Sequence, residues 1–215
     1  MSTSYSVRVD AHLDPGLSRW LWLVKWILAI PHYILLAFLW IGFVLVSVVA
    51  FFAILFTAHY PRRLFEFNLG VLRWTWRVSC YGYSALATDR YPPFTLKDVP
   101  DYPARLEIAY PERLSRGLVL VKWWLLAIPH YVVLSFLVGG GGGGLIGILV
   151  LVAAVVLLFR DTYPESIFDL VIGLNRWSYR VVAYAGLMTD EYPPFRLDQG
   201  GPEPADVVGR DSSPA

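Results

Sequence analysis

Charged residues and cysteine are scarce in this chain. Asp, Glu, Lys and Arg make up 16% of its 215 residues, against roughly 25% in a typical soluble domain. The single cysteine, Cys80, excludes an internal disulfide and fits polar segments in a reducing compartment. A formal net charge of +1 and 16% aromatic residues argue against nucleic-acid-binding, coiled-coil and disordered chains. With 56% hydrophobic residues and a mean hydropathy of +0.51, the composition predicts a small integral membrane protein.

An internal repeat organises the sequence. Ala-Ile-Pro-His-Tyr occurs at 29–33 and again, unchanged, at 127–131, and Thr-Asp-Arg-Tyr-Pro-Pro-Phe at 88–94 is matched by Thr-Asp-Glu-Tyr-Pro-Pro-Phe at 189–195. Repeats of this kind predict one structural unit per copy. The second copy also carries a glycine run, Gly139 to Gly144, where glycine favours a turn over a helix. The predicted organisation is a first copy at 5–98, a second copy at 102–198 and a disordered tail at 199–215.

The apolar segments are too long for one bilayer crossing each. From Trp20 to Ala58 the first copy is apolar except for Lys25 and His32, and about 39 positions are nearly twice the roughly 20 that one crossing needs. We therefore predict an α-helical integral membrane protein, with a transmembrane hairpin in each copy that turns at Trp40 to Gly42 or at the glycine run. Each hairpin is followed by an interfacial amphipathic helix. The predicted helices are 18–39, 43–58 and interfacial 61–87 in the first copy, and 117–138, 145–159 and interfacial 164–187 in the second.

The distribution of basic residues predicts the orientation. All 18 Lys and Arg lie outside the two predicted turns, so the hairpins place every basic residue toward one side, as the positive-inside rule expects of the cytoplasm. We expect a multi-pass protein of the plasma (cell inner) membrane with both termini cytoplasmic. The rival is one crossing per copy, near 33–57 and 131–159, which puts six glycines in a lipid-facing helix.

Short polar segments before each hairpin alternate between apolar and polar residues. This pattern occurs at 7–12 and at 104–109 and is typical of β-strands. It predicts a small cytoplasmic sheet shared between the two copies.

The repeated His-Tyr pair is a candidate intramembrane polar site, formed by His32, Tyr33, His130 and Tyr131. An ionisable group inside a membrane helix is a functional hypothesis by default. Three interpretations stay open: the pair holds the kink at the preceding proline, it forms a lipid or proton site shared between parallel copies, or the histidines bind a metal or haem. Because the hairpins contain no Cys, Asp or Glu to complete a ligand set, we expect no metal and no cofactor.

Basic residues near the start of each apolar segment and within each amphipathic helix are candidate contacts for anionic lipid headgroups. Topology anchoring explains them equally well. Asp89 and Asp190 are interpreted as turn residues and not as a catalytic pair, and no catalytic constellation recurs in both copies. The candidate headgroup contacts are Arg19, Lys25, Arg73, Arg77, Arg116, Lys122, Arg176 and Arg180.

Val-Lys-Trp at 24–26, Ala-Ile-Pro-His-Tyr at 29–33 and the Thr-Asp-Arg-Tyr-Pro-Pro-Phe motif at 88–94, all repeated, are similar to a known family. The chain resembles the bacterial, often actinobacterial, membrane family called domain of unknown function 4389, in two tandem copies. That resemblance implies no established substrate and no catalytic residue.

The functional prediction is a non-enzymatic protein that interacts with membrane lipids or acts as a scaffolding or accessory subunit of a membrane assembly. The alternative is a small transporter or proton-relay protein that uses the His-Tyr pair. The expected partners are membrane lipids, other membrane proteins or further copies of the chain, and no nucleic acid is expected.

Overall fold

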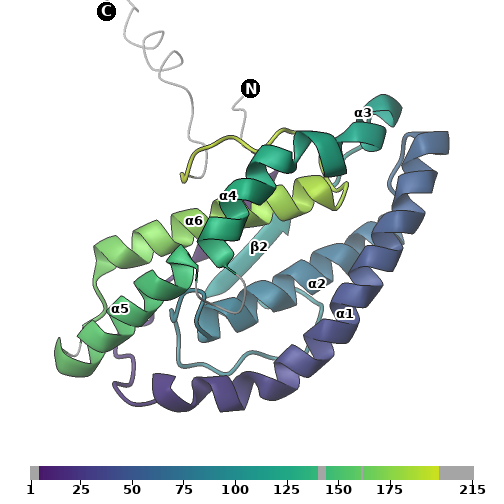
Figure 1. Ribbon diagram of the computed structural model, residues 1–215. Coiled ribbons are helices and arrows are strands. Elements are labelled where there is room, and N and C mark those ends of the chain that lie inside the picture. The colour runs from purple at the N-terminus through teal and green to yellow at the C-terminus, as the bar shows by residue number, and fades with distance from the viewer. Residues whose placement is uncertain (1–4, 140–143, 161, 199–215) are drawn as a thin grey trace, which may run out of the picture.

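The computed structural model describes residues 5–139, 144–160 and 162–198, and it is mostly helical with a two-stranded sheet. Figure 1 shows a long, curved helix α1 on one side, a broken run of helices α3 to α5 on the other, and α2 and α6 beside them. The elements in chain order are β1 (Val7–Ala11), α1 (Trp22–Thr57), α2 (Arg62–Tyr81), β2 (Ala104–Ile108), α3 (Arg116–Val121), the π-helical turn η1 (Lys122–Leu126), α4 (Ile128–Val138), α5 (Leu145–Arg160) and α6 (Glu165–Ala185).

The predicted turn at Trp40 to Gly42 is wrong. α1 continues through it as one helix of 36 residues, from Trp22 to Thr57. A single glycine costs a helix about 1 kcal/mol, which tertiary packing can offset. Gly42 lies against α2, where a Cβ on it would come 3.1 Å from the Phe67 ring. This glycine therefore serves the close approach of two helices and does not end one.

The second copy has the equivalent apolar segment in pieces. The axis bends by 44° between Arg116–Leu126 and Ile128–Val138, just before Pro129, and η1 lies on the near side of the bend. A proline in a helix removes a hydrogen bond and clashes with the preceding turn, which favours a bend at this place. The equivalent Pro31 lies inside the continuous α1, so the break in the second copy goes together with the π-helical turn η1 and not with proline alone. The predicted helix 117–138 is therefore two segments, whereas α5 agrees closely with the predicted 145–159.

The chain changes course between α4 and α5. Most of the predicted glycine turn, 140–143, lies outside the described residues, but a Cβ on Gly144 would collide with the backbone at Val138. Figure 1 shows α3, α4 and α5 following one another across the molecule in the direction opposite to α1. The early part of α6 packs on α5 and its later part on η1. The second copy is thus a bent, interrupted run, and the expectation of hairpins in parallel copies is not met.

The two amphipathic helices form the centre of the protein. α2 and α6 begin directly after Pro61 and Pro164, as predicted. Each is largely buried, and Trp76 of α2 contacts Tyr179 of α6 with ring centroids 5.2 Å apart. They lie between the long apolar helices and the sheet, and not on an outer surface as interfacial helices would.

The predicted sheet shared between the copies is confirmed. β1 and β2 pair antiparallel, with Val9 opposite Leu106. The strands are exchanged between copies, because β2 packs on α2 and β1 packs on α6. Arg73 Nε donates to the Leu106 carbonyl at 3.0 Å, and Arg176 Nε donates to the Val9 carbonyl at 3.0 Å. The protein therefore has three layers: the long apolar helices, then α2 and α6, then the sheet.

Candidate functional site

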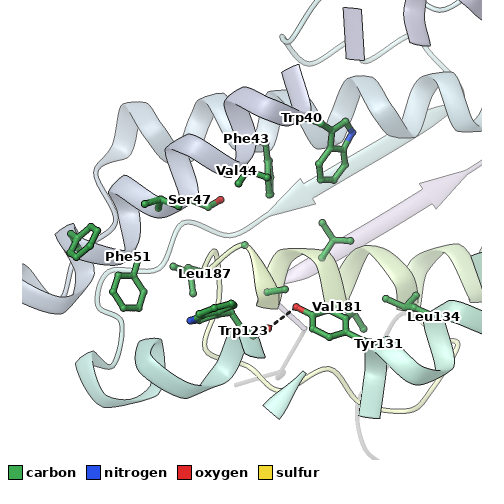
Figure 2. Close-up of a pocket in the computed structure, with 15 residues that line it drawn as sticks. Trp40, Phe43, Val44, Ser47, Phe51, Trp123, Tyr131, Leu134, Val181 and Leu187 are labelled. Atoms are coloured by element: carbon green, nitrogen blue, oxygen red, sulfur yellow. Dashed lines mark hydrogen bonds between the residues drawn. The ribbon is translucent and has the colours of Figure 1, made fainter. Parts of the chain in front are cut away.

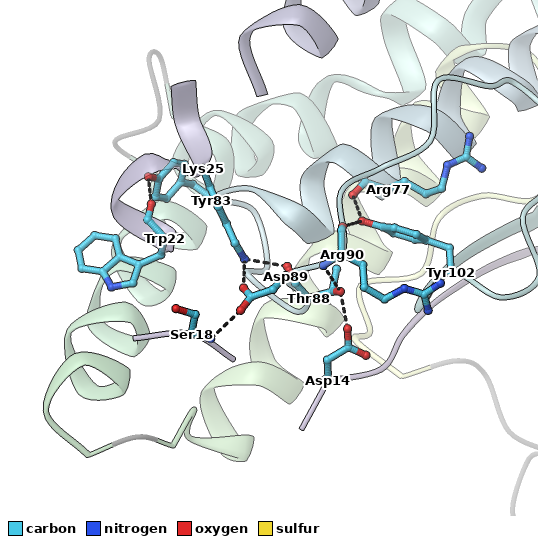
Figure 3. A network of polar contacts seen from close by, with 10 residues as sticks. All are labelled: Asp14, Ser18, Trp22, Lys25, Arg77, Tyr83, Thr88, Asp89, Arg90 and Tyr102. Carbon is cyan, nitrogen blue, oxygen red and sulfur yellow. Dashed lines mark hydrogen bonds and ion pairs between the residues drawn. The ribbon is translucent and has the colours of Figure 1, made fainter. Parts of the chain in front are cut away.

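A buried ion pair ties the start of α1 to the segment that follows α2 (Figure 3). Lys25 is 1% exposed, and its Nζ lies 2.7 Å from Asp89 Oδ1 and donates to the Thr88 carbonyl at 2.7 Å. The other carboxylate oxygen of Asp89 accepts from the Ser18 backbone N–H at 2.6 Å. Burying a lysine is costly unless it is paired and hydrogen-bonded, and both conditions hold here. The four groups form one junction.

The second copy repeats this junction with nearly the same geometry. Lys122 Nζ lies 2.7 Å from Asp190 Oδ1 and 2.9 Å from the Thr189 carbonyl, and the Ser115 N–H donates to Asp190 at 2.6 Å. The interpretation of the aspartates as turn residues missed this role. The sequence signal was available, since each copy has one lysine inside its apolar segment and one Thr-Asp pair after its amphipathic helix.

Two arginines of the central helices are also buried. Arg77 is 2% exposed and donates to the carbonyls of Lys97 and Thr95, and Arg180 is fully buried and donates to those of Arg196 and Asp198, at 3.2 and 2.6 Å. Burial lowers the pKa of both guanidinium groups below its ordinary value, although arginine stays charged. Each arginine holds the extended segment after the Pro-Pro motif of its own copy.

The eight candidate headgroup contacts therefore separate into three groups. The first is buried and paired within the protein, and the second binds strand carbonyls. The third is exposed at the starts of the two apolar segments. The first group is Lys25, Lys122, Arg77 and Arg180, the second is Arg73 and Arg176, and the third is Arg19 and Arg116.

His32 lies in an aromatic cluster of the first copy. It is fully buried, it stacks on Phe94 with ring centroids 4.0 Å apart, and its Nδ1 accepts from Trp74 Nε1 at 3.0 Å. Tyr91 completes the cluster and donates to the Leu28 carbonyl at 3.0 Å. Tyr33 is not in it and is 46% exposed.

His130 lies in the corresponding cluster of the second copy. It stacks on Phe195 at 4.5 Å and contacts Tyr192 and Trp177, yet neither of its ring nitrogens has a hydrogen-bond partner among the described residues. Tyr131 donates to the Trp123 carbonyl at 2.7 Å. The two clusters share no residue, so the structure does not join the histidines in one site. Within the described part of the chain, no group of three or more His, Cys, Asp or Glu side chains is placed to hold a metal ion.

The outer layer exposes much apolar surface. α1 is long and apolar enough to cross a membrane, and Arg116–Leu126 with Ile128–Val138 would pass the same test as one bent span. Large side chains along it are open to the surroundings, among them Phe38 at 68% and Phe136 at 73%. Contiguous apolar patches of this kind mark interaction surfaces.

One protein-family model matches the sequence twice, once in each copy. The family model described as a domain of unknown function (DUF4389) covers residues 19–95 and 119–196. The chain belongs to the DUF4389 family. Each DUF4389 match contains the junction lysine, the histidine, the buried arginine and the Thr-Asp pair of one copy, which confirms the predicted tandem repeat. No curated protein and no solved structure matches the chain.

Proposed function

We propose that this DUF4389 protein is a non-enzymatic, lipid-interacting membrane protein. Its layer of α1, α4 and α5 is embedded in one leaflet of a bilayer. Its sheet, on the opposite face of the protein, points away from the membrane into water. The observation that carries the proposal is the exposed apolar surface of that layer. Phe38 and Phe56 of α1 and Phe136 and Phe159 of the second copy are each 68–78% exposed, and water would leave them unfavourably hydrated.

The layering favours a helix that lies along the membrane over one that crosses it. Trp40, near the middle of α1, donates to Thr75 of α2, and Arg73, half a turn from Thr75, donates to the Leu106 carbonyl of the sheet. The exposed Arg105 and Glu107 flank that carbonyl. If α1 crossed the bilayer about its midpoint, these charges would lie at the depth of the hydrocarbon centre, where each costs about 3 kcal/mol or more.

The length of α1 agrees with this orientation. At 1.5 Å per residue its 36 residues extend over about 54 Å, against a hydrocarbon thickness of roughly 30 Å. The hairpin that four crossings require is also absent from the first copy. A helix that lies in the interface has no such limit on its length.

Anionic headgroups are the proposed lipid contacts of Arg19 and Arg116. Both side chains are exposed, and they precede the two apolar runs at equivalent positions of the repeat. Basic side chains beside an anionic membrane surface contribute about 1 kcal/mol each. The proton-relay alternative has no observation in its favour, because each histidine is enclosed by aromatic side chains of its own copy.

Reconstitution into vesicles tests the proposal. The chain should float with vesicles of phosphatidylcholine and resist extraction by alkaline carbonate, and phosphatidylglycerol should increase the bound fraction. Replacing both arginines, Arg19→Gln with Arg116→Gln, should remove the gain from phosphatidylglycerol and leave binding to phosphatidylcholine.

The matched control is Arg8→Gln with Arg105→Gln, on the sheet, which should keep the full gain. If the parent chain stays with the aqueous fraction, or if its apolar layer is covered by a second copy in a vesicle-free dimer, the proposal fails.

A further inference from the structure

An apolar groove lies between the two copies, on the open side of the helix layer. It has a volume of about 530 Å³ and is walled by the second half of α1, by η1 and α4, and by the end of α6 (Figure 2). This volume is within the roughly 300–1,000 Å³ of sites that hold small molecules. The groove thus has room for a ligand.

Ser47 and Tyr131, two polar side chains of the groove, already have hydrogen-bond partners. Ser47 Oγ accepts a hydrogen bond from Asn68 at 3.0 Å, and the Tyr131 hydroxyl donates to the Trp123 carbonyl at 2.7 Å. The remaining lining is almost entirely hydrocarbon and aromatic. A peptide segment would bring backbone N–H and C=O groups that need partners in an apolar site, and this lining offers few. An unbranched hydrocarbon chain makes no such demand.

The groove opens onto the exposed apolar layer. Its floor is buried, with Phe43 at 5%, Val181 at 0% and Leu187 at 3%, whereas its rim on α1 is exposed, with Val48 at 51% and Phe52 at 53%. An acyl chain that enters over this rim moves from the exposed apolar layer into the apolar groove and passes no charged side chain of the groove lining.

The walls that the second copy contributes to the groove differ from the corresponding part of the first copy. The equivalent place in the first copy is a cavity of about 260 Å³, where Tyr33, Leu36 and Val78 stand at the positions of Tyr131, Leu134 and Val181. Tyr83 lines that smaller cavity and donates to the Trp22 carbonyl at 2.5 Å. The second copy is two residues shorter between Tyr184 and Thr189 than the first is between Tyr81 and Thr88, and it has no tyrosine there.

Glycine at the end of α6 shapes the floor. A Cβ on Gly186 would come 2.8 Å from the ring of Phe43, so Phe43 of the first copy can only approach this helix end because it is glycine. We infer that the groove binds one acyl chain of a bilayer lipid, which it draws from the leaflet beside the apolar layer. This inference rests on the proposed membrane contact of that layer.

Photo-crosslinking tests the groove directly. The chain is reconstituted with phosphatidylglycerol that carries a diazirine in its acyl chain, and labelled peptides are mapped by mass spectrometry. Label is expected on residues 181–187 at the groove as well as on the outer faces of α1 and α5. Val182→Trp fills the groove from α6, and Val48→Trp fills it from its exposed rim without replacing a buried residue. Either should lower groove labelling at least tenfold.

The control is Val155→Trp, on the exposed face of α5, which should leave groove labelling unchanged. Thermal unfolding identifies any variant that does not fold, and Val48→Trp keeps the test open if Val182→Trp fails. Label on the outer faces with none at 181–187, or groove label that persists in both filled variants, overturns the acyl-chain site and leaves the membrane proposal standing. Absence of label everywhere overturns the membrane proposal itself.

Discussion

The two copies agree at their buried polar junctions and differ in their apolar layer. The Lys–Asp distance is 2.7 Å in both, and the Arg73 and Arg176 bonds to the exchanged strands are 3.0 Å in both. In contrast, α1 is continuous whereas its counterpart bends by 44° and its helix α4 ends at Val138. A buried charge has few acceptable geometries because an unpaired one is costly, whereas an apolar side chain that faces outward has many.

The largest expected effect tests the agreement at the junctions. Asp89→Asn or Asp190→Asn leaves a buried lysine without its counter-charge. We expect each to lower the free energy of unfolding by about 3 kcal/mol, at the lower end of the range for broken buried pairs, because the aspartates are partly exposed. Thermal unfolding in mild detergent measures the effect. Asp101→Asn, on an exposed loop, is the control. Unequal losses in the two copies would break the equivalence.

Tight packing on the central helices gives the next effect. A Cβ at Gly70 would come 2.8 Å from Leu96 Cβ and 2.9 Å from the Leu96 carbonyl, and a Cβ at Gly173 would come 2.9 Å from Leu197 Cβ. Gly70→Ala and Gly173→Ala should each cost about 2 kcal/mol through overpacking, with the larger loss at Gly70. Gly117→Ala meets nothing within 4 Å and should cost nothing. The same unfolding assay compares the three variants, and a stabilised Gly70→Ala would refute the close approach.

A smaller effect separates the histidine clusters. Trp74 donates to His32, whereas the Trp177 Nε1 has no partner among the described residues. Trp74→Phe therefore loses a buried hydrogen bond that Trp177→Phe does not. We expect the first variant to be less stable than the second by about 1 kcal/mol. Equal losses of stability in the two variants would contradict this difference in hydrogen bonding between the two histidine clusters.

The last effect is absent at neutral pH and appears only in alkali. Burial, with Asp190 and Tyr192 nearby, raises the pKa of Tyr184 from 10.0 to about 12. The folded protein thus favours the neutral phenol, so this contribution to stability is complete below pH 10 and is lost as the pH rises toward 12. Tyr184→Phe should flatten the fall in unfolding temperature over that interval. A parallel fall in the parent chain and the variant would contradict the assignment.

The sequence predicted the elements better than their arrangement. The repeat followed from the recurrence of identical motifs, and the starts of α2 and α6 followed from the position of proline. The paired strands followed from the alternation of apolar and polar residues with a period of two. The turn at Gly42 was mispredicted because local propensity does not reveal that Phe67 packs there. Strand exchange and the junction of Lys25 with the Thr88-Asp89 segment link residues 33 and 63 positions apart, and no local pattern encodes such contacts.

The site was predicted in part. His32, His130 and the basic residues were recognised by type, but their partners were not. Phe94 and Phe195 lie in the repeated Pro-Pro-Phe motifs, and the repeat of both motifs could have linked them to the histidines. The groove at Gly186 depends on a two-residue difference between copies, whose consequence appears only in three dimensions.

Membrane depth along α1 distinguishes a helix that lies in one leaflet from one that crosses. Cys80 is fully buried and burial raises the pKa of its thiol, so the native chain is a silent background for labelling. Spin labels are attached at Leu23→Cys, Phe38→Cys, Phe56→Cys and Arg105→Cys. The depth of each label in the bilayer is measured from its relative accessibility to oxygen and to a water-soluble paramagnetic reagent. Embedding in one leaflet predicts similar, shallow depths for the three α1 labels and a water-exposed label at 105. A label at position 38 that lies at the bilayer centre, with the labels at positions 23 and 56 at opposite interfaces, would contradict embedding in one leaflet.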